Sequence, residues 1–170
     1  MIYHYFGDKA GLYVAVLEDV LGELRREELK LEVDHVEPLD GMMALFHFIH
    51  RHFGRHGELI ALLSGENLLE ARFLRRSTET PIEASPLIAL IEGLLRRGEK
   101  SGQFRSGIDP LVLYVAMVSL SYFHRSNVHT LSAIFRQDLR LPAWQAAQRR
   151  FAEDMIKSTL LRDQGGKSDA

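Results

Sequence analysis

The stretch that decides the fold is PLDGMMALFHFIHRHF, residues 38–53, where apolar residues recur every three or four positions. At this spacing one face of a helix collects Met42, Leu45, Phe46, Ile49 and Phe53. Pro38 suits the first turn, where a backbone N–H has no helical partner to lose. No part of the chain keeps the strict alternation that a half-buried strand needs. The sequence therefore predicts an all-α protein, a helical bundle.

The same periodicity extends to both sides of this stretch. Before it, Asp8 is a good N-cap for a helix reaching about residue 31, with Glu23, Arg25, Arg26, Glu27, Glu28 and Lys30 expected on its outer face. After it, a loop is expected at residues 75–81, and Pro86 favours a helix start near residue 85. The later helices are expected over about residues 58–70, 85–100, 110–122, 130–135 and 142–162.

Composition restricts the classes of function. The 170 residues carry 21 Lys+Arg against 23 Asp+Glu, a net charge of -2, so the surface as a whole is not built for nucleic acid. The absence of cysteine excludes disulfide frameworks, thiolate zinc sites and cysteine nucleophiles. No apolar run approaches the roughly 18 residues of a membrane span, and no secretory leader opens the sequence. A cytoplasmic protein of one domain, without membrane contact, is expected.

Histidines and one carboxylate offer alternative functions. His47, His50, His52 and His56 form i,i+3 and i,i+4 pairs that could bind Zn²⁺ or Ni²⁺, although the two pairs face differently. No Gly-x-Ser-x-Gly elbow, phosphate-binding glycine loop or His-Glu-x-x-His motif occurs, so no cofactor is expected. An all-α metal-binding module or an enzyme of unknown reaction is the alternative function.

Glu66 stands where the helical pattern predicts a core residue, on one stripe with Leu59, Leu62 and Leu63. Two interpretations are open. Glu66 is a structural carboxylate satisfied by Arg72 or a histidine, or it lines a ligand cavity beside Asn67.

The first thirteen residues, MIYHYFGDKAGLY, resemble the end of the helix-turn-helix of TetR-family transcriptional regulators, with the signature Tyr-x-x-Phe-x-x-Lys-x-x-Leu. Tyr3, Phe6, Lys9 and Leu12 stand at these spacings. Residues 119–127 and 129–139 are similar to the penultimate helical region of one TetR subgroup, so the resemblance covers the whole chain. It implies a non-enzymatic, ligand-responsive regulator, a repressor, with the fold of the family's C-terminal domain.

The resemblance implies a division into a headpiece remnant at residues 1–8, an effector-binding and dimerisation domain at 9–162 and a flexible tail at 163–170. A complete family member carries two more helices and most of the recognition helix before this point, so specific base reading by this chain is not expected. Backbone N–H groups and basic or hydroxyl side chains at a helix start can still hold a phosphate. The expected phosphate contacts are Tyr3, His4, Tyr5 and Lys9.

In the family, helices after the headpiece enclose a largely apolar pocket, and the last two helices of each subunit form a dimer interface. The resemblance thus implies a homodimer, operator DNA bound by the full-length form, and a small, mainly apolar or aromatic effector. The implied pocket residues are Phe46, His50, Leu63, Glu66, Asn67, Ile91, Tyr114, Met117, Ser121 and Tyr122. Plain core packing is the alternative for Phe46, Leu63, Ile91 and Met117. The implied interface residues are Phe135, Trp144, Ala147, Phe151, Ala152, Met155, Ile156 and Leu160.

Overall fold

The computed structural model describes residues 8–33, 35–77 and 79–162, the side chains of residues 79–85 excepted. These residues form seven α-helices and one short 3-10 helix, which confirms the all-α prediction. The helices are α2 (Lys9–Leu29), α3 (Pro38–Arg55), α4 (Gly57–Leu68), η1 (Leu74–Arg76), α5 (Glu79–Lys100), α6 (Pro110–Ser126), α7 (Val128–Phe135) and α8 (Pro142–Leu160).

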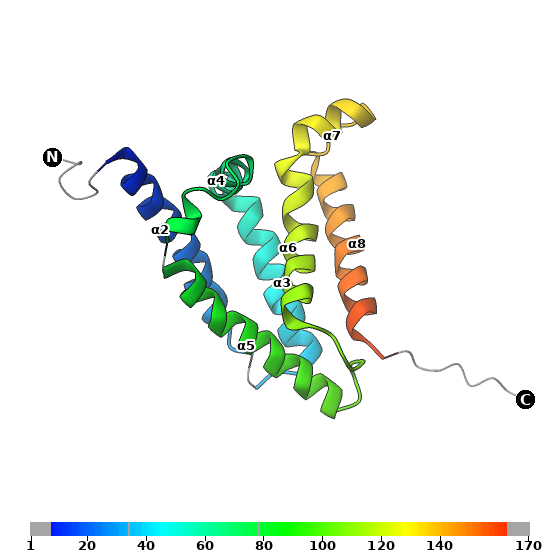
Figure 1. Cartoon of the computed structure of the whole chain (residues 1–170). Coiled ribbons are helices and arrows are strands. Elements are labelled where there is room, and N and C mark those ends of the chain that lie inside the picture. Colours follow the sequence, from blue (N-terminus) through cyan, green and yellow to red (C-terminus); the bar gives the residue numbers. More distant parts are fainter. Residues whose placement is uncertain (1–7, 34, 78, 163–170) are drawn as a thin grey trace, which may run out of the picture.

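Helix α3 lies at the centre of the bundle. It packs against α2, α4, α5, α6 and α8, and in Figure 1 α2 and α5 lie on one side of it while α6 and α8 lie on the other. Its apolar face is fully buried at Met42, Leu45, Phe46 and Ile49. Burial of each such side chain contributes roughly 1.5–3 kcal/mol. The periodic stretch that predicts the fold class therefore supplies the middle of the core.

Two aspartates set helix starts at the predicted positions. The Asp8 carboxylate accepts a hydrogen bond from the Gly11 N–H at 2.7 Å, and Asp109 accepts one from the Val112 N–H at 2.8 Å. Pro110 follows the second cap in the first turn of α6. An N-cap of this kind contributes about 1 kcal/mol, because it satisfies an N–H that has no partner inside the helix.

The start of α5 differs from the prediction. The helix begins at Glu79 rather than near residue 85, so that Pro86 lies inside it and part of the expected 75–81 loop is helical. A proline inside a helix removes one backbone hydrogen bond and crowds the preceding turn, which is why local rules favoured a start at Pro86. Helix α4 ends at Leu68 and α8 at Leu160, each two residues before the expected end.

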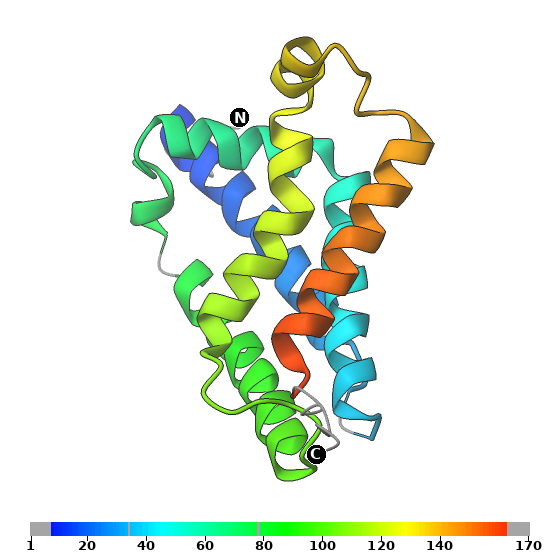
Figure 2. The ribbon, with the colours of Figure 1, turned by 90° about the vertical axis from the view of Figure 1, so that its right-hand side faces the viewer.

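The two ends of the bundle are built differently. At one end, α7 projects beyond α6 and α8 in both views (Figures 1 and 2). At the other end, Phe104 forms an isolated antiparallel bridge with Leu161, and the Phe104 ring lies 2.1 Å from where a Cβ on Gly98 would stand. Only glycine fits at that position.

Within the described part of the chain, no helix is long and apolar enough to span a membrane.

Candidate functional site

Most of the apolar residues expected to line an effector pocket lie in the main core. Phe46, Ile91 and Met117 are fully buried members of one hydrophobic cluster, and the cluster is covered by the partly buried Leu63, Tyr114 and Tyr122. Phe46, Ile91 and Met117 thus have the packing contacts that the core alternative requires.

The polar residues expected in the same pocket are separated from one another. Asn67 is exposed at the end of α4. Ser121 is buried, but its hydroxyl donates to the Met117 carbonyl of its own helix at 2.9 Å. The Tyr122 hydroxyl bonds to the Ser64 hydroxyl at 2.8 Å, which links α6 to α4. These side chains do not converge on one point.

Glu66 is buried, and one carboxylate oxygen organises the chain that follows α4. Oε2 accepts hydrogen bonds from the N–H groups of Phe73 at 3.2 Å and Leu74 at 2.8 Å. Its partners are backbone groups rather than Arg72 or a histidine. Burial raises the pKa of the neighbouring Tyr13 phenol, and the negative charge of Glu66 raises it further. Glu66 therefore holds the segment around η1 near α2.

We expect Glu66→Gln to lower the free energy of unfolding by about 1–3 kcal/mol without any ligand, because a neutral amide is a weaker acceptor for the two partly buried N–H groups. Urea unfolding of both proteins measures the difference. Asn67→Ala is the matched control, since Asn67 is exposed on the same helix and should change stability by less than about 0.5 kcal/mol. Equal midpoints for Glu66→Gln and the unmodified chain would contradict this role.

A buried polar cluster joins α2 to α6 and corrects the expected outer face of α2. Glu28 is fully buried, and Arg25 contacts it through an ion pair. Arg25 donates to the Tyr114 hydroxyl at 2.6 Å, and that hydroxyl donates to Glu28 at 3.2 Å. The guanidinium also stands 5.0 Å from the centre of the Tyr114 ring. These contacts make Tyr114 a bridge between helices rather than an unattached pocket wall.

Burial sets the electrostatics of this cluster. It raises the pKa of Glu28 to about 7, although Arg25 and the Tyr114 hydroxyl favour the charged form. Burial also raises the pKa of Tyr114, and repulsion from the negative charge of Glu28 is the second cause of this increase. A sequence signal was present: Glu28 continues the stripe of Leu17, Leu21 and Leu24 at helical spacing, as Glu66 continues its own stripe.

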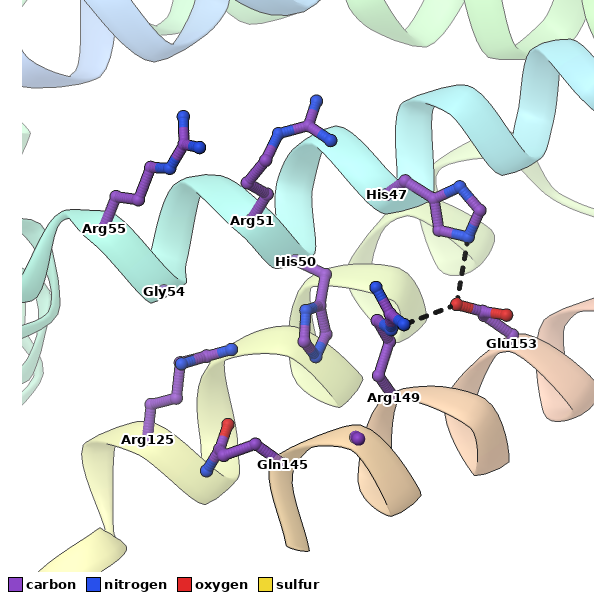
Figure 3. Close-up of a pocket in the computed structure, with 10 residues that line it drawn as sticks. His47, His50, Arg51, Gly54, Arg55, Arg125, Gln145, Arg149 and Glu153 are labelled. Atoms are coloured by element: carbon purple, nitrogen blue, oxygen red, sulfur yellow. Dashed lines mark ion pairs between the residues drawn. The ribbon is translucent and has the colours of Figure 1, made fainter. Parts of the chain in front are cut away.

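A polar hollow of about 740 Å³ opens between α3, α6 and α8 (Figure 3). Its lining residues are His47, His50, Arg51, Gly54, Arg55, Arg125, Gln145, Ala146, Arg149 and Glu153. In Figure 3, His47 and His50 point from α3 toward α8, and Arg149 rises from α8 between them. His50 alone of the ten expected pocket residues lines this hollow. The other residues that line the hollow were not predicted as pocket residues, because they come from three helices that are far apart in the sequence.

Hydrogen bonds order the side of the hollow nearest α8. The His50 Nε2 atom is 3.1 Å from the Gln148 Oε1 atom, and the Gln148 amide donates to the Leu120 carbonyl at 2.7 Å. His47 Nε2 lies 3.1 Å from a Glu153 oxygen that also pairs with Arg149 at 3.5 Å. Burial lowers the pKa of His50, so its imidazole is neutral near pH 7.

The histidine pairs do not assemble a metal site in the part of the chain that the structure describes, where no group of three or more His, Cys, Asp or Glu could hold an ion. His47 and His50 take Glu153 and Gln148 as partners. His52 and His56 stack on each other with ring centres 4.1 Å apart.

Helices α6 and α8 leave a row of apolar side chains exposed, here called the apolar face. Its members are Val112, Val115 and Phe123 of α6 and Phe151 and Met155 of α8. Side chains of both helices, including Val112 and Met155, line a hollow of about 510 Å³ on this face. Exposed apolar side chains that gather on two neighbouring helices are typical of an interface.

The expected interface residues divide between two faces of α8. Phe151, Met155 and Ala147 are exposed, Trp144 is partly buried, and Phe135 is exposed on α7. In contrast, Ala152, Ile156 and Leu160 are buried in the core of the same chain. The residues of α6 on the apolar face were missed, because the helix is apolar nearly all round and its periodicity does not show which side is covered.

The expected phosphate contacts are described only in part. Lys9 is exposed in the first turn of α2, directly after the Asp8 cap. Tyr3, His4 and Tyr5 lie outside the described residues, and so do Phe6 and the expected tail at 163–170.

Two comparisons with known proteins agree. A family model described as "Tetracyclin repressor-like, C-terminal domain" matches residues 38–156, which run from the start of α3 into α8. The chain is also similar to the HTH-type transcriptional repressor NicS of Pseudomonas putida, with 32% identity over 162 residues that make up 95% of this chain and 76% of that protein. Regulators of this type act as dimers that bind operator DNA and small effectors. The predicted family is thereby confirmed, and the chain belongs to the TetR family of transcriptional regulators.

Proposed function

We propose that this chain is the effector-binding and dimerisation part of a ligand-responsive repressor, in which a bound small molecule controls the placement of two DNA-binding headpieces. Family membership and the repressor to which the chain is similar support this function. The proposed partners are a second copy of the chain, operator DNA in the full-length form and a small effector.

The observation that carries the proposal is the double role of α6. This helix presents part of the apolar face, and through Tyr114 it is tied to Arg25 and Glu28 of α2. Helix α2 begins at Lys9, within the stretch that resembles the family's DNA-binding signature. A movement of α6 relative to α6 of the second copy would therefore move α2 as well. The buried contact between α6 and α2 cannot lengthen without breaking its hydrogen bonds.

The apolar face is the proposed dimer interface. Pairing of α6 and α8 with the same helices of a second copy would cover Phe123, Phe151 and Met155 and form a four-helix contact. The effector pocket proposed from the resemblance would have to open within the core around Phe46, Met117 and Tyr122, whose apolar surroundings favour a mainly apolar or aromatic molecule.

Distance measurement between spin labels tests this function. The chain has no cysteine, so Asp19→Cys places one label on the exposed side of α2 in each copy. A dimer gives a defined distance between the two labels, and we expect that distance to change when toluene, benzylamine or benzoate binds. A chain without any label–label coupling at micromolar concentration would contradict the dimer. An unchanged distance with a bound probe would contradict the transmission to α2.

A further inference from the structure

The hollow between α3, α6 and α8 has a charge pattern that the apolar effector pocket does not explain. Four arginines and one glutamate line it: Arg51, Arg55, Arg125, Arg149 and Glu153. We propose that this hollow binds a small organic anion through a carboxylate group, with Arg125 and Arg149 as its main anchors. The inference concerns binding alone and does not depend on the proposed repressor function.

Arg125 and Arg149 line the hollow from α6 and α8, while Arg51 and Arg55 point away from these two helices in Figure 3 and also line a second hollow with Glu23 and Glu27. Glu153 pairs with Arg149 and His47, whereas no carboxylate of the described residues pairs with Arg51, Arg55 or Arg125. A concave surface of one sign concentrates counter-ions, because the low-dielectric protein walls focus the field into the opening. A planar guanidinium also matches a carboxylate with two parallel hydrogen bonds.

Arg125 is held in place before any ligand arrives. A Cβ on Gly54 would stand 3.2 Å from the Arg125 Nη2 atom, so the guanidinium lies directly against the backbone of α3. Its Nε atom is buried without a hydrogen-bond partner among the described residues. Burial disfavours the cation and lowers the pKa of Arg125. An anion in the hollow would accept hydrogen bonds from the outer guanidinium nitrogens of a side chain whose position is already fixed.

Neutral polar groups complete the wall beside Arg125. The Gln145 amide donates to the Leu139 carbonyl at 2.6 Å, while its Oε1 atom is buried without a partner. Behind His50, the buried His124 ring stacks at 5.9 Å between centres. Burial lowers the pKa of His124 to about 4, and repulsion from the positive charge of Arg125 is the second cause. Gln145 and His50 line the hollow and add no positive charge of their own, whereas His124 is not among its lining residues.

The size of the hollow favours an organic anion over an inorganic ion. Its volume of about 740 Å³ falls within the range of roughly 300–1,000 Å³ that holds small organic ligands. A single phosphate would fill only a small part of it. The ligand class is therefore a carboxylate with an organic body of moderate size.

The proposal is tested by isothermal titration calorimetry of the 170-residue chain. The titrants are benzoate, succinate, citrate, benzamide and inorganic phosphate. We expect at least one of the three carboxylates to bind, and benzoate to bind at least about tenfold more tightly than benzamide, which has the same shape without the charge. The single tryptophan, Trp144, is next to Gln145 in the chain, so binding should change its fluorescence.

Two variants and one control assign the site. Arg125→Met should weaken carboxylate binding at least about tenfold, because it removes the preplaced guanidinium. Arg149→Met should weaken it as well, and its side chain is exposed enough that the fold does not depend on it. Arg96→Met is the matched control, since Arg96 is exposed on α5 and does not line the hollow.

Three results would overturn the proposal. The first is that no carboxylate binds with a dissociation constant below about 1 mM. The second is that the affinity of the bound carboxylate is unchanged in both Arg125→Met and Arg149→Met. The third is that phosphate competes at equal affinity, which would make the hollow a general oxyanion site. A dimer that binds no carboxylate would refute this inference alone, and a monomer that binds benzoate would refute the proposed dimer alone.

Discussion

Ile156→Glu is expected to unfold the chain, whereas Met155→Glu, one residue earlier, is expected to leave it folded but unable to dimerise. Ile156 is 2% exposed and belongs to the core, while Met155 is 45% exposed on the apolar face. An unpaired carboxylate at position 156 would cost on the order of 5 kcal/mol, which is comparable to the whole stability of a domain. At position 155 the carboxylate stays in water until a second copy would cover it.

Circular dichroism and sedimentation velocity separate the two outcomes. Ile156→Glu should lose its cooperative thermal transition, and Ile156→Val should keep it with a loss of only about 1 kcal/mol. Met155→Glu should show helical content like that of the unmodified chain but sediment as a monomer at micromolar concentration. A dimeric Met155→Glu would show that the apolar face is not the interface.

Glu28→Gln is expected to become more stable relative to the unmodified chain as the pH rises from 5 to 8. The Glu28 carboxyl titrates near 4.5 when unfolded and about 7 when folded, so the folded chain binds its proton more tightly. The resulting stabilisation is complete below about pH 4.5 and is lost as the pH rises through 7. One pKa unit corresponds to about 1.4 kcal/mol. The difference in the free energy of unfolding between Glu28→Gln and the unmodified chain should therefore change by up to about 3 kcal/mol from pH 5 to 8.

Urea unfolding at pH 5, 6, 7 and 8 measures this change. The two proteins differ only at this side chain, so the comparison isolates Glu28, which faces Arg25 and Tyr114. Glu27→Gln is the matched control: this exposed neighbour bonds to Lys30, which lowers the pKa of Glu27 and places its titration below this pH range. A difference that stays constant from pH 5 to 8 would show that Glu28 is ionised throughout.

Local rules predicted the elements that depend on neighbouring residues. The Asp8 and Asp109 caps, the buried stripe of α3 and the all-α class follow from spacing within a few turns, and the structure has all of them. The family was visible in the signature that includes Lys9 and Leu12. The misplaced start of α5 shows the limit of such rules, because tertiary packing can carry a helix through Pro86.

Only the tertiary structure decided which way ambiguous residues face. Helix α8 has two apolar stripes, and its packing on α3 and α6 buries Ile156 while leaving Met155 outside. The packing of α2 likewise places Glu28 beside Tyr114, a residue 86 positions away. The polar hollow collects Arg125 and Arg149 with His50 from three helices. Periodicity specifies the faces of one helix, but a site shared by several helices depends on how those faces meet, and that is a property of the packed core.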